Sequence, residues 1–312
     1  MLGNTCIMPQ IPNALQRYFT FTLMLFCWCA TAQTNSLFNR QRLNSLAQRW
    51  ELDSLSQPAT FVVTTYKPVY ILPFRWSSSP NGQPRSGNSN PDYTVTDNLN
   101  LNNLEAKFQI SFKVKVAQGL FWGNGDLWGA YSQKAHWQVY NASLSRPFRE
   151  INYEPEAILN FTTHYSLFGF KGRMAGISIN HQSNGRSYPL SRSWNRIIAH
   201  AAFEKDDWQV FVRAWYRIPD DIDDNPNISR YVGHGDATVT YATDKNIFSA
   251  TVAPNFSFNK NMKGSIELNW ARSIKGNLKF HAQFFHGYGE TLIDYNQLQT
   301  IVGVGISLVE WM

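Results

Sequence analysis

The feature that most constrains this chain is a strict alternation of apolar and polar side chains. Apolar residues occupy the even positions from 108 to 116, and polar residues occupy the odd positions from 107 to 115. The same period of two returns at 264–272 and 278–284. Successive side chains of a β-strand point to opposite faces, whereas a helix repeats every 3.6 residues. The pattern therefore predicts strands that have one apolar and one polar face.

Turn residues separate further segments of this kind, and no long pattern of helical period interrupts them. We expect about twelve strands, at 60–72, 106–116, 127–140, 156–165, 173–183, 194–203, 208–218, 236–243, 247–254, 264–272, 278–284 and 300–309. The stretch 77–98 is rich in Ser, Asn, Gly and Pro, which predicts a long loop between the first two strands.

Two architectures fit this alternation: a soluble β-sandwich and an all-β, twelve-stranded antiparallel transmembrane β-barrel. Many segments reach the ~9–11 residues that a tilted membrane-spanning strand needs. Tryptophans such as Trp122, Trp137 and Trp208 lie toward strand ends, as aromatic girdles at a membrane interface do. The mean hydropathy of −0.34 argues against a bundle of membrane helices, but it suits a barrel because it averages an apolar outer face with a polar interior. The pattern favours the barrel.

The first 32 residues predict a secretory signal peptide. Arg17 precedes the apolar stretch 18–30, which runs into the small-residue motif Ala-Thr-Ala, and we expect cleavage after Ala32. A short membrane anchor is the alternative. All 3 Cys of the chain lie before this cleavage position, so the mature chain has no disulfide framework and depends on its core or on closure of a sheet.

Residues 33–58 predict a separate segment before the barrel, which we expect to span 59–312. Leu43, Leu46 and Trp50 fall at i, i+3 and i+7, which indicates a short amphipathic element within this segment.

Three polar residues occupy positions where the alternation predicts apolar ones. Odd positions of 173–183 share one apolar face, which places His181 and Ser183 beside Ile177 and Ile179. Asn195 lies on the apolar face of the next strand, at the same end. On a barrel this face meets lipid, which is a costly place for polar groups unless their substrate comes from the lipid.

These residue types suit nucleophilic catalysis. A serine hydroxyl becomes a nucleophile beside a base, and a histidine serves as that base when a third group fixes its tautomer. Asn195 can be the third group through its side-chain oxygen, although it stabilises an imidazolium less than a carboxylate would. The alternative is that His181 and Ser183 are a polar pair near a loop, and the residues by themselves leave both interpretations open.

The sequence NHQSNGRS at 180–187, followed by SRSWNR at 191–196, resembles the signature of the outer membrane phospholipase A family. Further matches are YSQKAHWQ (131–138), RPFRE and NYEPE (within 146–156), DDNP (223–226), GYGETLIDYN (287–296) and VGVG (302–305). The resemblance covers most of the mature chain. It implies a twelve-stranded barrel in the outer membrane of a Gram-negative bacterium, with residues 33–58 in the periplasm, that hydrolyses the acyl esters of phospholipids and lysophospholipids.

The resemblance also implies the roles of individual residues. Ser183 would be the nucleophile, His181 the general base and acid, and Asn195 the residue that orients the imidazole. The backbone amide of Gly185 would form part of the oxyanion hole.

The family depends on calcium, which prefers oxygen ligands and can polarise an ester carbonyl. By position, the implied ligands are the Ser191 hydroxyl, the Arg186 carbonyl, the Asp224 carboxylate (with Asp223 as the alternative) and Ser145 of the partner subunit. Members of the family can carry an acidic residue where this chain has Tyr188, which puts a second, monomer-state calcium site in doubt.

Gln133 is the only amide on an otherwise apolar strand face, where a polar group is costly without a partner. The resemblance places this position at the interface of a homodimer whose formation activates the enzyme; a glutamine at the level of the lipid headgroups is the alternative. The rival function is a non-catalytic barrel, either a porin-like channel or a structural protein. Basic residues alternate with apolar ones instead of forming a patch, which argues against nucleic acid as a partner.

Overall fold

The computed structural model describes residues 44–53, 59–255 and 262–308. The signal peptide expected at 1–32 lies outside these residues, as does Leu43 of the amphipathic element. No helix of the described ranges has the length and apolarity to cross a membrane.

The described elements are strands joined by turns and loops, with a few short helices. In chain order they are α2 (Leu46–Trp50), β1 (Val63–Thr65), β2 (Tyr70–Ser77), η2 (Pro91–Tyr93), β3 (Leu104–Ala117), β4 (Asp126–Trp137), η3 (Ala142–Leu144), β5 (Phe148–Thr162), β6 (Ser166–Leu167), β7 (Phe170–Ser183), β8 (Ser193–Lys205), β9 (Trp208–Ile218), α3 (Ile228–Val232), β10 (Gly235–Ala242), β11 (Asn246–Pro254), β12 (Gly264–Lys275), β13 (Leu278–Gly287) and β14 (Gln299–Ser307).

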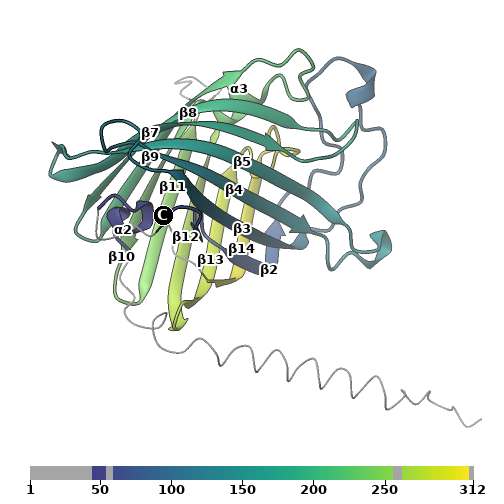
Figure 1. Cartoon of the computed structure of the whole chain (residues 1–312). Helices are drawn as coiled ribbons and strands as arrows, with labels where there is room; N and C mark the ends of the chain where they lie inside the picture. Colours follow the sequence, from purple (N-terminus) through teal and green to yellow (C-terminus); the bar gives the residue numbers. More distant parts are fainter. Residues whose placement is uncertain (1–43, 54–58, 256–261, 309–312) are drawn as a thin grey trace, which may run out of the picture. The chain divides into compact units, whose positions relative to one another are not determined.

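The sheet closes on itself, as the sequence predicts. Each long strand pairs antiparallel with its neighbours, and β2 joins β14 on one side and β3 on the other. Within the described residues, twelve strands make this closed barrel, while β1 and β6 are short additions paired with β3 and β7. Figure 1 shows the strands side by side around the barrel. The long loops gather at one end, called here the long-loop end (Figure 1); they join β2 to β3, β4 to β5, β7 to β8, β9 to β10 and β13 to β14. The opposite end has mostly short turns, such as those between β8 and β9 and between β12 and β13.

The first predicted strand, 60–72, is wrong in its extent. The chain forms β1, breaks at Lys67 and Pro68, and continues as β2 as far as Ser77. Pro68 has no N–H to give to a ladder. Side chains of β3 take the place of the missing ladder bonds: the Ser111 hydroxyl accepts from the Lys67 amide at 3.0 Å, and the Gln109 side chain donates to the Pro68 carbonyl at 2.8 Å.

Many of the charged side chains in the lumen are paired with a charge of opposite sign. Lys107 is 0% exposed and donates to Gln283 and Glu290, both at 2.7 Å. Arg149 binds Glu105 through two nitrogens, at 2.9 and 3.0 Å. A buried charge is tolerated only when it is paired and hydrogen-bonded. The polar face predicted for the strands is therefore a packed ion-pair network and not the wall of an open channel.

Helix α2 lies inside the barrel, toward the short-turn end (Figure 1). Its Trp50 is 6% exposed and packs edge-on against Trp128, with 5.8 Å between the ring centroids. The Lys113 ammonium lies 4.3 Å from the centroid of the Trp50 ring and donates to the Arg49 carbonyl at 2.8 Å. The amphipathic element predicted from the sequence thus exists, and its apolar face contacts the barrel interior.

Removal of the Trp50 side chain should destabilise the barrel. We expect Trp50→Ala to lower the free energy of unfolding by about 3 kcal/mol, the low end of the range for a buried tryptophan. Urea unfolding in detergent micelles, followed by circular dichroism, measures the change. Ile222→Ala is the control because Ile222 is 68% exposed in the loop between β9 and α3, and it should change stability by less than about 0.5 kcal/mol. Equal losses in the two variants would contradict the packing role of Trp50.

Candidate functional site

His181 and Asn195 face each other on the outside of the barrel. They are register partners on β7 and β8, and the imidazole Nδ1 lies 2.7 Å from the Asn195 side-chain oxygen. An amide oxygen only accepts hydrogen bonds, so Nδ1 carries the ring proton and Nε2 is left as a base. The neighbouring Ile179 is 63% exposed, which marks this face as the apolar exterior. The structure thus brings these two predicted residues together.

Ser183 ends β7 on the same outward face as His181. Two residues along a strand span about 7 Å at the Cα atoms, a distance that a histidine and a serine side chain can bridge. Among the described contacts, no hydrogen bond joins the Ser183 hydroxyl to the imidazole. Catalytic hydrogen bonds are commonly long or misaligned before substrate binds.

A polar cluster on the lumen-facing side of β7 and β8 joins the same two strands. Asn180 and Arg196 are register partners next to His181 and Asn195, and the guanidinium donates to the Asn180 oxygen at 2.7 Å. The Arg196 guanidinium also lies 4.1 Å from the centroid of the Trp194 ring, and it pairs with Glu154 at 3.2 Å. These contacts fix the relative position of β7 and β8, and therefore of the outward pair.

The loop between β7 and β8 is built around Asn184. This side chain is 3% exposed; it donates to the Leu190 carbonyl at 2.8 Å and accepts from the Arg192 amide at 3.0 Å. Gly185 follows with a φ of 62°, and a Cβ there would lie 3.1 Å from the Tyr153 ring. The turn therefore favours glycine, because any other residue would have a strained backbone and a close contact with the Tyr153 ring. Asn184 was missed by the sequence analysis because nothing in the alternation shows where a loop side chain will be buried.

The implied calcium ligands lie partly together. The Ser191 hydroxyl donates to the Asp224 carboxylate at 2.6 Å, whereas the Asp223 carboxylate faces Arg217 at 2.5 Å. Arg186 lies in the same loop as Ser191, and its side chain donates to the Arg149 carbonyl at 2.7 Å. A carboxylate, a hydroxyl and a backbone carbonyl are donors that suit a hard cation.

Ser145 lies elsewhere, exposed in the β4–β5 loop directly after η3. Among the described residues, no three His, Cys, Asp or Glu side chains gather as a metal cluster.

Gln133 points outward from β4, as predicted, and its side-chain oxygen accepts from the Tyr131 hydroxyl at 2.9 Å. Gln133 pairs in register with Tyr153 of β5, which pairs with Ser183 of β7. One row across three strands thus links the predicted interface residue to the predicted nucleophile.

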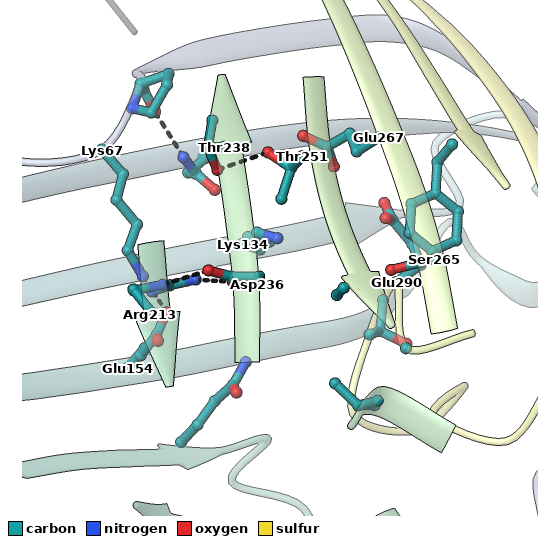
Figure 2. A pocket seen from close by; sticks show the side chains of 18 of the residues that line it. Lys67, Lys134, Glu154, Arg213, Asp236, Thr238, Thr251, Ser265, Glu267 and Glu290 are labelled. Atoms are coloured by element: carbon teal, nitrogen blue, oxygen red, sulfur yellow. Dashed lines mark hydrogen bonds and ion pairs between the residues drawn. The ribbon is translucent and has the colours of Figure 1, made fainter. Parts of the chain in front are cut away.

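The lumen holds a cavity of about 270 Å³ that is separate from this site. Figure 2 shows its charged lining, in which Lys67 pairs with Glu154 at 2.6 Å and Arg213 pairs with Asp236. The cavity faces the barrel interior, whereas His181, Ser183 and Asn195 face outward. Lys134 and Glu267 line the same cavity, and Glu267 accepts from the Asn269 side chain at 2.9 Å.

Comparison with known proteins identifies the family. The family model of phospholipase A1 matches residues 46–308. Phospholipase A1 of Klebsiella pneumoniae is 37% identical over 248 residues, which cover 80% of this chain and 82% of the relative. The structure of outer membrane phospholipase A from Escherichia coli superposes with a TM-score of 0.72 and 35% identity, covering 81% of this chain and 100% of that one.

A second solved structure, the calcium-bound dimer of outer membrane phospholipase from Salmonella typhi, has a TM-score of 0.72 and 35% identity and covers 81% of this chain and 95% of that one. The family model matches nearly all of the described residues, and the Klebsiella pneumoniae relative is 37% identical. The Escherichia coli structure has the same closed barrel. These findings point to the same family. The chain therefore belongs to the phospholipase A1 family of outer-membrane β-barrel enzymes.

Proposed function

We propose that this enzyme hydrolyses the acyl ester bonds of phospholipids and lysophospholipids with Ser183, His181 and Asn195, on the side of the barrel that faces lipid. The observation that carries the proposal is the 2.7 Å hydrogen bond between His181 and Asn195, on an apolar exterior next to Ser183. An active-site variant of the E. coli enzyme, in which an asparagine is replaced by alanine, supports an asparagine in this role.

The reaction proceeds in two transfers. The Ser183 oxygen attacks the ester carbonyl while its proton passes to Nε2 of His181, and Asn195 holds the resulting imidazolium through Nδ1. The tetrahedral intermediate then expels the alcohol of the lysophospholipid, which takes the proton from Nε2. Water attacks the acyl-serine with His181 again as the base, which releases a fatty acid and restores Ser183. In this proposal the Gly185 amide donates to the oxyanion.

The proposal includes calcium held by oxygens of two loops. Ser191 and Asp224 are already in contact at 2.6 Å, and the Arg186 carbonyl belongs to the same loop as Ser191. When bound, calcium would supply positive charge close to the developing oxyanion. The calcium-bound dimer of the Salmonella typhi relative supports both the ion and a dimeric active state.

In the proposed dimer, Ser145 of the partner subunit completes the ligand set, and Gln133 lies at the interface. The oxygen of the Gln133 amide accepts from Tyr131 within the chain, and its NH₂ group would gain an acceptor by meeting the same surface of a second copy. The row from Gln133 through Tyr153 to Ser183 supports an interface close to the nucleophile, in which the partner subunit would form one side of the substrate cleft. The paired charges in the lumen argue against the porin-like alternative.

Loss of the nucleophile should abolish hydrolysis. We expect Ser183→Ala to reduce kcat by at least about 10³-fold, and Asn195→Ala to reduce it by about 10–100-fold because it only misorients the imidazole. Release of fatty acid from phospholipid in mixed micelles measures both. Ser166→Ala, which removes an exposed hydroxyl of β6 whose hydrogen bond goes to the Phe170 carbonyl, is the control. Ser183→Ala activity close to that of the parent would refute the catalytic assignment.

Chelation of calcium should stop the reaction without unfolding the barrel. Because the ion would share the oxyanion charge, we expect excess chelator to lower the rate by about 10²–10³-fold. Added calcium should restore the rate, and magnesium should not, since it demands a tighter octahedral shell. Hydrolysis of short-chain esters is the assay, and an unchanged rate in chelator would rule out the calcium role.

Substitution of Gln133 should weaken the dimer. A hydrogen bond between membrane-embedded partners contributes about 1 kcal/mol, so Gln133→Ala should raise the dimer dissociation constant by about fivefold. Sedimentation equilibrium in detergent with calcium present measures this constant. Tyr241→Phe, which removes a polar group from the outer face of β10, should leave it unchanged. Dimers of equal strength in Gln133→Ala and the parent would place the interface elsewhere.

A further inference from the structure

The carboxylate of Asp224 is held at both of its oxygens. Oδ1 accepts from the Tyr93 hydroxyl at 3.1 Å, and Oδ2 accepts from the Ser191 hydroxyl at 2.6 Å. Asp224 is 7% exposed and Tyr93 is 5% exposed. The Ser193 hydroxyl of β8 also donates to Oδ2, at 3.4 Å. Ser191 and Ser193 thus hold one oxygen of this buried carboxylate, and Tyr93, from a different loop, holds the other.

Tyr93 lies in the stretch 77–98, for which the sequence predicts only a loop. It ends the short helix η2 in the segment between β2 and β3, and its ring packs edge-on against Tyr188, with 4.7 Å between the ring centroids. The contact with Tyr188 positions the ring, and the hydroxyl then reaches Asp224. A Phe at position 93 keeps the ring that makes this contact.

The same loop is fastened to the Asp224 segment independently of Tyr93. The Ser86 hydroxyl donates to the Asp224 carbonyl at 2.9 Å, and the Asn88 side chain donates to the Asp223 carbonyl at 2.9 Å. The Tyr295 hydroxyl donates to the Ser86 carbonyl at 2.6 Å. Burial raises the pKa of Tyr295 to about 12, which keeps this hydroxyl a donor at neutral pH. Loss of the Tyr93 hydroxyl should therefore leave the loop in place.

We propose that Tyr93 is a positioning residue for the cation: it holds Oδ1 of Asp224 and thereby orients the carboxylate that, with the Ser191 hydroxyl, would hold the ion. The assignment rests on the calcium role proposed above. A serine hydroxyl that donates its proton to a carboxylate keeps its lone pairs for a metal. A carboxylate that is already oriented also loses less conformational freedom when the ion binds. Outer-shell partners of this kind commonly change metal affinity by about 10–100-fold.

Calcium binding to full-length protein in detergent micelles tests the assignment, with Ser183→Ala as a catalytically silent parent. Isothermal titration with calcium chloride, at a protein concentration where the dimer forms, gives the dissociation constant. We expect Tyr93→Phe, which keeps the ring on Tyr188, to raise this constant about 10-fold. In protein that retains Ser183, half-saturating calcium should rise by the same factor, while the rate at saturating calcium stays at the parental level.

Tyr140→Phe is the matched control. Its hydroxyl is also at the long-loop end but donates to the Pro73 carbonyl at 2.9 Å, so calcium affinity should not change. An unchanged dissociation constant in Tyr93→Phe would overturn the positioning role, as would a lower rate that saturating calcium fails to restore. A parent that binds no calcium would instead refute the calcium role itself, and this assignment with it.

Discussion

Closure of the sheet is the constraint on which the rest of the molecule depends. In lipid no water is present to satisfy a backbone N–H or C=O, so a spanning sheet must leave no free edge. The pairing of β2 with both β14 and β3 meets this requirement. Once the sheet is closed, alternate residues must face either lipid or the lumen. The period of two in the sequence and the paired charges of the interior follow from this single requirement.

The same constraint explains where the chemistry lies. The lumen is occupied by ion pairs such as Lys107 with Glu290 and by helix α2, and phospholipid reaches the barrel from outside. Polar groups that act on lipid are then expected on the apolar face, which is where His181 and Asn195 lie. Their rigidity comes from the opposite side of the same strands, where Arg196 binds Asn180. One face of β7 and β8 thus carries the outward pair of His181 and Asn195, and the opposite face carries charged contacts of the barrel interior.

The alternation predicted most of the strands and the outward direction of His181, Ser183 and Asn195, because parity alone fixes the face of a strand residue. It misplaced the first strand because side chains of β3, and not a backbone ladder, bind the backbone of Lys67 and Pro68. An alternation of apolar and polar residues does not show such a break in the pairing. It could show neither that Trp50 enters the lumen nor that Tyr93 reaches Asp224. Those contacts join segments far apart in the chain and depend on the closed shape.

The most direct test of the central claim is chemical labelling of the lipid-facing serine. A fluorophosphonate bearing an alkyl chain reacts with a serine only where a base activates it. Digestion and mass spectrometry of the labelled protein should find the adduct on Ser183, formed with calcium and lost in excess chelator. Labelling of a different serine, or equal labelling of Ser183 in His181→Ala, would contradict a catalytic site on the outer face of the barrel.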